Sequence, residues 1–168
     1  MRPSSSSLRR WTFCGRMSLV IKLKLYLDNC CYNRPFDDQT QLLVRLETEA
    51  KLFIQEEIKN GTFELVWSYI LEQENRDNPF ERRREAISPW SLRAKVDIDE
   101  SEDVIQTAEF YHQLGLKVKD SLHVACAIIG KADFLITTDH RMQKQVNKQI
   151  QIVNPIQFVQ LYAEMRKL

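Results

Sequence analysis

Short apolar segments alternate along the chain with longer segments of helical spacing, and this alternation restricts the possible folds most strongly. Segments typical of strands lie at 20–27, 62–67, 133–137 and 151–153. Helical spacing covers 42–58, 69–76, 80–90, 101–114 and 120–129, and Pro155 begins a last helix. Strands that alternate with helices form parallel sheets covered on both faces. We therefore expect a Rossmann-like α/β domain in three layers, α/β/α, with a central, mainly parallel sheet of four to five strands.

The first 16 residues differ in composition from the rest of the chain. They contain four Arg, four Ser and no acidic residue, and they lack the apolar core of a secretory signal peptide. Their composition superficially matches an organellar transit peptide, but a strand-like segment follows Ser18 directly, so we favour an upstream extension over 1–16. We expect one domain over 18–168. Without the four Arg the formal charge falls from +1 to −3, which argues against a protein that coats polyanions.

Cysteine and histidine spacing gives no indication of a zinc site. The four cysteines form no Cys-x-x-Cys pair, and the three histidines are scattered. Reduced thiols in a cytosolic compartment are the plainest interpretation. No segment approaches the ~20 apolar residues of a membrane span. We therefore expect a cytoplasmic protein without a membrane partner.

Acidic residues follow three of the expected strands. Asp28 comes directly after the first strand, Glu72 and Glu74 after the second, and Asp139 after the third. Asp120 begins the helix that precedes the third strand. Ligands of open α/β sheets gather outside the carboxyl ends of the strands, so we expect these acids to meet at one edge. Glu72 and Glu74 lie about 200° apart on a helix, so only one of them can face the site.

Each acid also has a purely structural explanation. Asp28 could close an Asx-turn, and Asp120 and Asp139 could cap or charge-balance helices. Glu74 could be a solvated helical residue. Converging carboxylates, however, raise one another's pKa unless a cation neutralises them. Mg²⁺ or Mn²⁺ suits a site of oxygen ligands and could activate water for phosphodiester hydrolysis.

Four segments resemble the motifs of PIN-domain proteins. Residues 119–127, Lys-Asp-Ser-Leu-His-Val-Ala-Cys-Ala, and 132–139, Ala-Asp-Phe-Leu-Ile-Thr-Thr-Asp, are similar to the C-terminal signature of that family. Residues 25–29, Leu-Tyr-Leu-Asp-Asn, resemble its first motif, and 68–74 its second. The segments occur in the family's order and spacing, so the resemblance covers essentially the whole expected domain.

The resemblance implies a PIN-like fold and an endoribonuclease that cleaves RNA with Mg²⁺ or Mn²⁺. By motif position, Asp28, Asp120 and Asp139 would ligate or orient the metal. Glu74 would complete the catalytic set, and the family pattern favours it over Glu72 because the usual acid lies six residues after the serine. Many relatives are toxins of bacterial toxin–antitoxin pairs and many form homodimers. The resemblance therefore also implies an antitoxin or regulatory protein as a possible partner, and a homodimer.

The sequence departs from the family pattern at two places. Asn29 stands where many members carry Thr or Ser, and Arg141 and Met142 stand where some members carry a further acid. The second departure weakens the case for a second metal ion. We expect one ion.

Two kinds of side chain around the acids have open interpretations. His123 lies three residues after Asp120, on the same helical face. It could act as a general base, but we favour a packed, neutral histidine of the core. Thr137 and Thr138 could lend hydroxyls to the waters of the metal or cap the backbone.

Substrate contacts are expected from basic side chains near Asp139. Arg141, Lys144 and Lys148 share one helix face at i, i+3 and i+7, which suits phosphate binding. Tyr32, on the expected loop after the first strand, could stack on a base or pack in the protein.

Two rival functions stay open at this point. A non-catalytic RNA-binding PIN-like module would keep the fold, and metal-dependent cleavage that disappears in Asp28→Asn or Asp120→Asn would exclude it. A phosphatase with Asp28 as nucleophile would need a second acid two residues later, where Cys30 stands. We therefore expect a metal-dependent ribonuclease.

Overall fold

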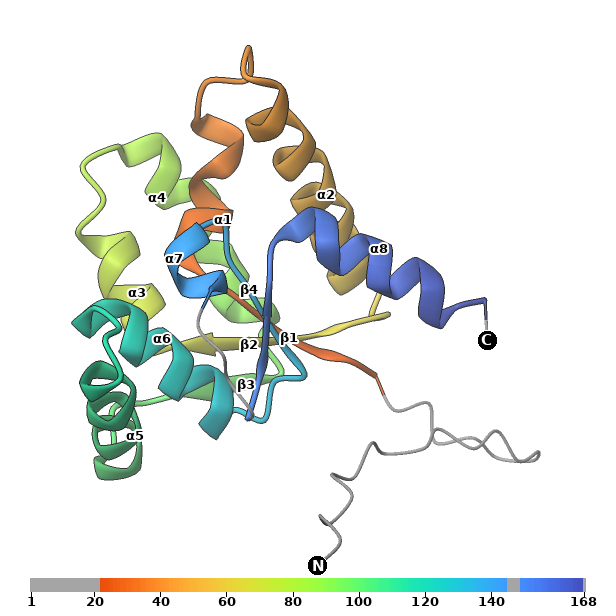
Figure 1. Cartoon of the computed structure of the whole chain (residues 1–168). Helices are drawn as coiled ribbons and strands as arrows, with labels where there is room; N and C mark the ends of the chain where they lie inside the picture. The colour runs from red at the N-terminus through yellow and green to blue at the C-terminus, as the bar shows by residue number, and fades with distance from the viewer. Residues whose placement is uncertain (1–21, 145–148, 168) are drawn as a thin grey trace, which may run out of the picture.

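The computed structural model of the chain describes residues 22–144 and 149–167 (Figure 1). The expected extension 1–16 and the start of the expected domain at residue 18 lie outside the described residues. The five strands are β1 Lys24–Leu27, β2 Glu64–Ser68, β3 Val96–Ile98, β4 Phe134–Ile136 and β5 Gln151–Val153. The α-helices are α1 Asn29–Asn33, α2 Leu42–Lys59, α3 Tyr69–Arg76, α4 Glu81–Ile87, α5 Glu102–Gln113, α6 Val118–Ile129, α7 His140–Gln143 and α8 Pro155–Met165.

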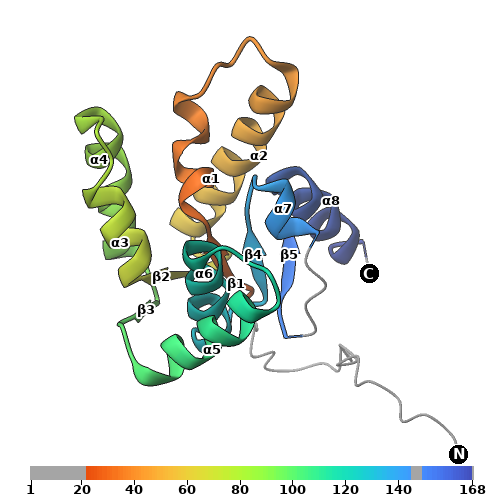
Figure 2. The same ribbon diagram turned by 60° about the vertical axis from the view of Figure 1, so that its left-hand side comes forward.

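The strands form one fully parallel sheet in the order β3-β2-β1-β4-β5. Helices α2 and α8 pack against each other on one face of the sheet, and α5 and α6 pack against each other on the other (Figures 1 and 2). This arrangement confirms the expected three-layer α/β/α fold with a parallel sheet.

The core lies between the central strands and the helices that cover them. Leu25, Leu27 and Leu65 are fully buried on β1 and β2, and so are Leu135 and Ile136 on β4. These nearly continuous apolar runs are typical of parallel strands covered on both faces. Burial of this kind fixes the strand register, and the register decides which residues leave the sheet at its carboxyl edge.

Three local elements differ from the sequence prediction. Strand β3 was not predicted, because its central residue Asp97 is exposed and β3 lies at the edge of the sheet. The expected loop after β1 instead contains α1 and a 3-10 turn, Arg34–Phe36. Helix α4 ends at Ile87 rather than near Trp90, since Pro89 has no N–H to continue an α-helix, and a 3-10 segment, Ser88–Arg93, follows.

Candidate functional site

The strand order changes direction at β1, which has β2 on one side and β4 on the other. In open α/β sheets such a switch point is where a crevice forms outside the carboxyl ends of the strands. Asp28 follows β1 directly, and its N–H donates to the carbonyl of Ile136, the last residue of β4, at 2.9 Å. The residues that leave β1 and β4 are therefore held side by side at the switch point.

Asp28 is buried, with 6% of its surface exposed, and its carboxylate is held by neighbours on both oxygens. Thr137 Oγ1 donates to Oδ2 at 2.8 Å, and Cys30 Sγ donates to the same oxygen at 3.1 Å. Oδ1 lies 3.3 Å from Nε2 of His123. The carboxylate makes no capping hydrogen bond to α1. It is thus oriented toward the neighbouring strand and α6, not used to close a turn.

Glu74 reaches the same place from the helix after β2. Ser68 begins that helix, because its hydroxyl accepts a hydrogen bond from the N–H of Leu71. Oε2 of Glu74 lies 2.8 Å from His123 Nε2, and Oε1 lies 3.6 Å from Lys119 Nζ. Burial acts to raise the pKa of Glu74, but the hydrogen bond and charge of His123 outweigh it and leave this pKa lowered.

Glu72 is directed elsewhere, as the 200° separation on the helix requires. Its charge acts on Asp97 of β3, whose pKa is raised first by partial burial, then by Asp99 and Glu72. The structure therefore brings Glu74 and not Glu72 to the switch point.

His123 joins Asp28 and Glu74. The three residues each offer one ligand atom, and these atoms lie within 4.8 Å of one another. The imidazole is 2% exposed, and its Nδ1 is 2.7 Å from the hydroxyl of Tyr26, which is itself 2.7 Å from Ser68 Oγ. This chain of contacts fixes the orientation of the ring, so that Nε2 points at both carboxylates.

Buried imidazoles ordinarily resist protonation, and burial acts to lower the pKa of His123. The charge of Asp28 and the hydrogen bond and charge of Glu74 outweigh that effect, so the pKa of His123 is raised. His123 is therefore a buried histidine, as favoured, and the carboxylates beside Nε2 shift its titration toward the imidazolium relative to a free imidazole.

Asp120 and Asp139 complete the carboxylate cluster, which we define as Asp28, Glu74, Asp120 and Asp139. The pKa of Asp120 is raised, first by burial and then by the negative charges of Asp139 and Asp28. Asp139 caps α7 by accepting hydrogen bonds from the N–H groups of Arg141 and Met142 through Oδ1. The structural role foreseen for Asp139 is present, and its charge still acts on Asp120.

The cluster has the chemistry of a cation site. Its four carboxylates come from the segments that follow β1 and β4, from α3 after β2, and from the first turn of α6. Among the described residues, the basic groups in ion pairs with it are His123, Lys119 at 3.6 Å from Glu74, and Arg141 at 3.8 Å from Asp139. Oxygen ligands with one imidazole suit a hard divalent ion such as Mg²⁺ or Mn²⁺. The negative charges of Asp139 and Asp28, which help to raise the pKa of Asp120, would be balanced by such an ion.

The residues expected to contact substrate differ in whether the structure leaves them accessible. Arg141 and Lys144 are exposed on and just after α7, close to Asp139, whereas Lys148 lies outside the described residues. Tyr32 is 1% exposed, and its ring packs edge-on against Trp67 with centroids 5.4 Å apart. Of the two alternatives for Tyr32 the structure shows packing, and the expected contact with a base is wrong because the ring is out of reach.

Several residues of the site were not predicted. Tyr26 shares the face of β1 with Asp28, two positions away, and this period-2 relation was the available signal. Cys30 and Lys119 flank predicted acids in sequence, but only the folded chain shows that Cys30 Sγ lies 3.3 Å from Thr137 Oγ1. Ser68 appeared only as the start of a motif.

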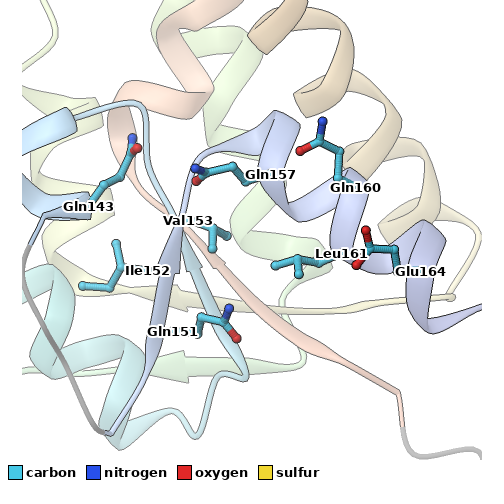
Figure 3. A pocket seen from close by; sticks show the side chains of 8 residues that line it. All are labelled: Gln143, Gln151, Ile152, Val153, Gln157, Gln160, Leu161 and Glu164. Atoms are coloured by element: carbon cyan, nitrogen blue, oxygen red, sulfur yellow. The ribbon is translucent and has the colours of Figure 1, made fainter.

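A separate hollow lies beside β5 (Figure 3). It has a volume of ≈400 Å³ and is lined largely by glutamine amides, among them Gln143 and Gln157. Gln143 donates to the carbonyl of Thr137 at 2.9 Å, and Gln157 takes part in the capping box of α8. Its one carboxylate is Glu164, and it contains no member of the carboxylate cluster. It is therefore not the candidate cation site.

Comparisons with known proteins agree with this geometry. A family model described as PIN domain matches residues 34–148, which is more than half of the chain and includes Glu74, Asp120 and Asp139. The chain is similar in structure to VapBC2 from Rickettsia felis, solved bound to a DNA fragment from its promoter. That likeness has a TM-score of 0.52 and 16% identity, and it covers 79% of this chain and 98% of the other. No curated protein matches the sequence. Within the described segments, no helix combines the length and apolar character needed to cross a membrane.

Proposed function

This chain belongs to the PIN-domain family, and from this premise we propose that it is an endoribonuclease that hydrolyses RNA phosphodiesters with a carboxylate-bound Mg²⁺ or Mn²⁺. One observation carries the proposal. Asp28, Glu74 and His123 place ligand atoms within 4.8 Å of one another at the switch point of the sheet, where Asp120 also feels the charge of Asp28. Proteins seldom bury carboxylates together without a function that needs their charge.

The donor set fits a divalent ion. Asp28, Asp120 and Asp139 are the proposed metal ligands, with Glu74 and His123 adjoining them. A bound ion would supply Lewis acidity, lowering the pKa of a water molecule and neutralising charge on the phosphodiester. His123 could offer Nε2 as a ligand only when this nitrogen is deprotonated.

The side chains around the carboxylates position them. Thr137 and Cys30 hold Oδ2 of Asp28, which leaves Oδ1 directed at the cluster. Tyr26 fixes the His123 ring through Nδ1. Hydrogen-bonded neighbours of this kind orient ligands and commonly account for 10–100-fold in metal affinity or activity.

Phosphate contacts are proposed for exposed basic residues around the cluster. Lys119 is exposed at the start of α6, with Nζ 3.6 Å from Oε1 of Glu74, and Arg141 and Lys144 are exposed near Asp139. Such contacts hold the backbone of an RNA strand without reading its sequence. We expect their loss to weaken RNA binding more than it slows cleavage at saturating RNA.

We extend the proposal to partners and place in the cell. We propose a toxin-type protein controlled by an antitoxin, which the fold likeness to VapBC2 supports, and a cytoplasmic homodimer. Helix α2 presents Leu42, Leu43 and Leu46 to the outside, each at least 46% exposed. Apolar side chains gathered on one exposed helix are typical of a protein interface.

The test is cleavage of mixed RNAs by the purified protein. Cleavage with Mg²⁺ or Mn²⁺ that stops with EDTA, and is lost in Asp28→Asn and Asp120→Asn, supports the proposal. RNA binding without cleavage under any metal would replace it with the non-catalytic module.

A further inference from the structure

A second cavity lies behind α1, away from the carboxylate cluster. It has a volume of ≈190 Å³ and is lined by residues of α1 and the 3-10 turn after it, of α2, and of the end of α4 with the 3-10 segment that follows. Figure 1 shows α1, α2 and α4 around this part of the molecule. The aromatic residues that line it are Tyr32, Phe36 and Trp90, and its polar residues besides Tyr32 are Lys51 and Gln55. It shares no residue with the carboxylate cluster.

Lys51 brings a positive charge into this cavity without an anion to balance it. Its side chain is 5% exposed, it has no ion pair or hydrogen bond with any residue the structure describes, and its Nζ lies 5.8 Å from the centroid of the Tyr32 ring. The carboxylate one turn earlier on α2, Glu47, is held instead by Arg34, with Nη2 2.6 Å from Oε2. Burial lowers the pKa of Lys51 to about 8, with the nearby charge of Lys59 acting in the same direction.

Two further donors that line this cavity have no hydrogen-bond acceptor. Nε2 of Gln55 and the hydroxyl of Tyr32 are both buried without a hydrogen-bond partner, on side chains 5% and 1% exposed. A buried donor left unpaired costs about 1–3 kcal/mol. Two such donors beside one cavity, with the ammonium of Lys51 lining it as well, indicate a missing acceptor rather than independent defects.

The shape and chemistry of the cavity define the missing group. Three donors, one of them charged, require an anionic acceptor, and a carboxylate can accept from all three. The aromatic walls favour an apolar, planar body. An apolar cavity of about 150 Å³ holds benzene, so ≈190 Å³ suits one ring with its carboxylate. We propose that this cavity, the Lys51 pocket, is a binding site for a small aromatic carboxylate.

Benzoate is the probe, measured by calorimetric titration of the whole protein with EDTA present. We expect saturable binding to the wild-type protein and a shift of the Trp90 indole NMR signal, because Trp90 lines the pocket. Benzyl alcohol, which keeps the ring without the charge, and acetate, which keeps the charge without the ring, should each bind at least about tenfold more weakly. The proposal does not depend on nuclease activity.

Variants decide whether Lys51 is responsible. Lys51→Met keeps the length of the side chain and should weaken benzoate binding at least tenfold. Arg45→Met removes an exposed cation from the same helix and should leave binding unchanged. Tyr32→Phe removes only the hydroxyl, and a several-fold loss is expected; it carries the test if Lys51→Met does not fold. Absence of saturable binding, equal binding by Lys51→Met or Tyr32→Phe, or a benzoate effect that spares Trp90 would each overturn the proposal.

Discussion

Helix α1 borders two buried regions whose charges are unbalanced in opposite directions. Asp28, at its start, lies with Glu74 and the buried imidazole of His123, and its charge acts on Asp120 together with that of Asp139. Tyr32, one turn later, lines the pocket in which Lys51 has no anion. In the first region hydrogen bonds from Thr137 and Cys30 hold the carboxylate of Asp28 in place, whereas in the second the donors have no partner.

The difference between the two regions lies in how each buried charge is supported. The carboxylate cluster has neighbours that fix the direction of its ligand atoms, as a site for a small ion requires, since coordination tolerates little misplacement. The Lys51 pocket instead offers space, aromatic walls and unpaired donors, as a site for an organic anion requires. We therefore expect a cation to complete the carboxylate cluster and an organic anion to complete the Lys51 pocket.

The largest effect is expected from neutralising the carboxylate at the centre of the cluster. Asp28→Asn keeps the shape of the side chain but removes the charge, so RNA cleavage should fall by at least about 100-fold. The initial rate at saturating Mg²⁺ measures this. Glu72→Gln is the matched control, because Glu72 is directed away from the switch point and its charge raises the pKa of Asp97 instead. Equal losses of cleavage rate in the two variants would show that the carboxylate cluster matters no more than other acidic residues nearby.

A smaller loss is expected when the support of Asp28 is removed. Thr137→Val deletes the hydroxyl that donates to Oδ2 at 2.8 Å, and cleavage should fall about 10–100-fold. The metal concentration that gives half-maximal rate should rise, and added metal should restore part of the activity, as a merely structural defect would not allow. Thr138→Val, a buried neighbour, should stay within a few-fold of the wild type.

The fold was predictable from the sequence because burial determines it. Continuous apolar runs such as 25–27 can only be central strands, and the acids that follow them must leave at one edge. Strand β3 was missed because Asp97 interrupts it and edge strands need little burial. Helix α1 was missed because its five residues, Asn-Cys-Cys-Tyr-Asn, lack helical periodicity.

The sequence was sufficient to predict the acidic residues of the site, but not the contacts that those residues make with other side chains. Position after a strand selects Asp28, and motif order selects Glu74 over Glu72. No local pattern could show that His123 lies between two carboxylates, because the three residues come from different elements. Equally, Lys51 looks like any charged residue of an amphipathic helix, and only the folded chain shows that it is 5% exposed, with Nζ 5.8 Å from the centroid of the Tyr32 ring.

Stability measurements should show that the Lys51 pocket contains a buried positive charge without a balancing anion. Lys51→Met removes an unpaired buried charge and should raise the free energy of unfolding by about 1–3 kcal/mol at neutral pH. The folded-state pKa of about 8 lies below the ordinary 10.5. The unfolded chain therefore binds more protons between about pH 8 and 10.5, and wild-type stability rises across that window. The difference in unfolding free energy between Lys51→Met and the wild type should therefore shrink between about pH 8 and 10.5. A difference that does not change with pH would show that Lys51 is not a buried, unpaired cation.

The smallest effect is expected at His123 in the metal-free protein. Its pKa is raised above the ordinary 6.5 by the nearby carboxylates, despite burial. The stability that it contributes is therefore fully present below about pH 6.5 and is lost as the pH rises through the folded-state pKa. The loss caused by His123→Gln, measured by urea unfolding with EDTA, should be larger at pH 6 than at pH 9. A loss that grows with pH would mean that His123 is neutral in the cluster.

Binding of Mn²⁺, followed by the disappearance of its free electron paramagnetic resonance signal, tests the central claim most directly. We expect the wild-type protein to bind one Mn²⁺, and Asp28→Asn to bind it at least about tenfold more weakly while Glu72→Gln binds as the wild type does. Equal binding by wild type and Asp28→Asn, or no binding by either, would contradict a cation site at the carboxyl ends of β1 and β4.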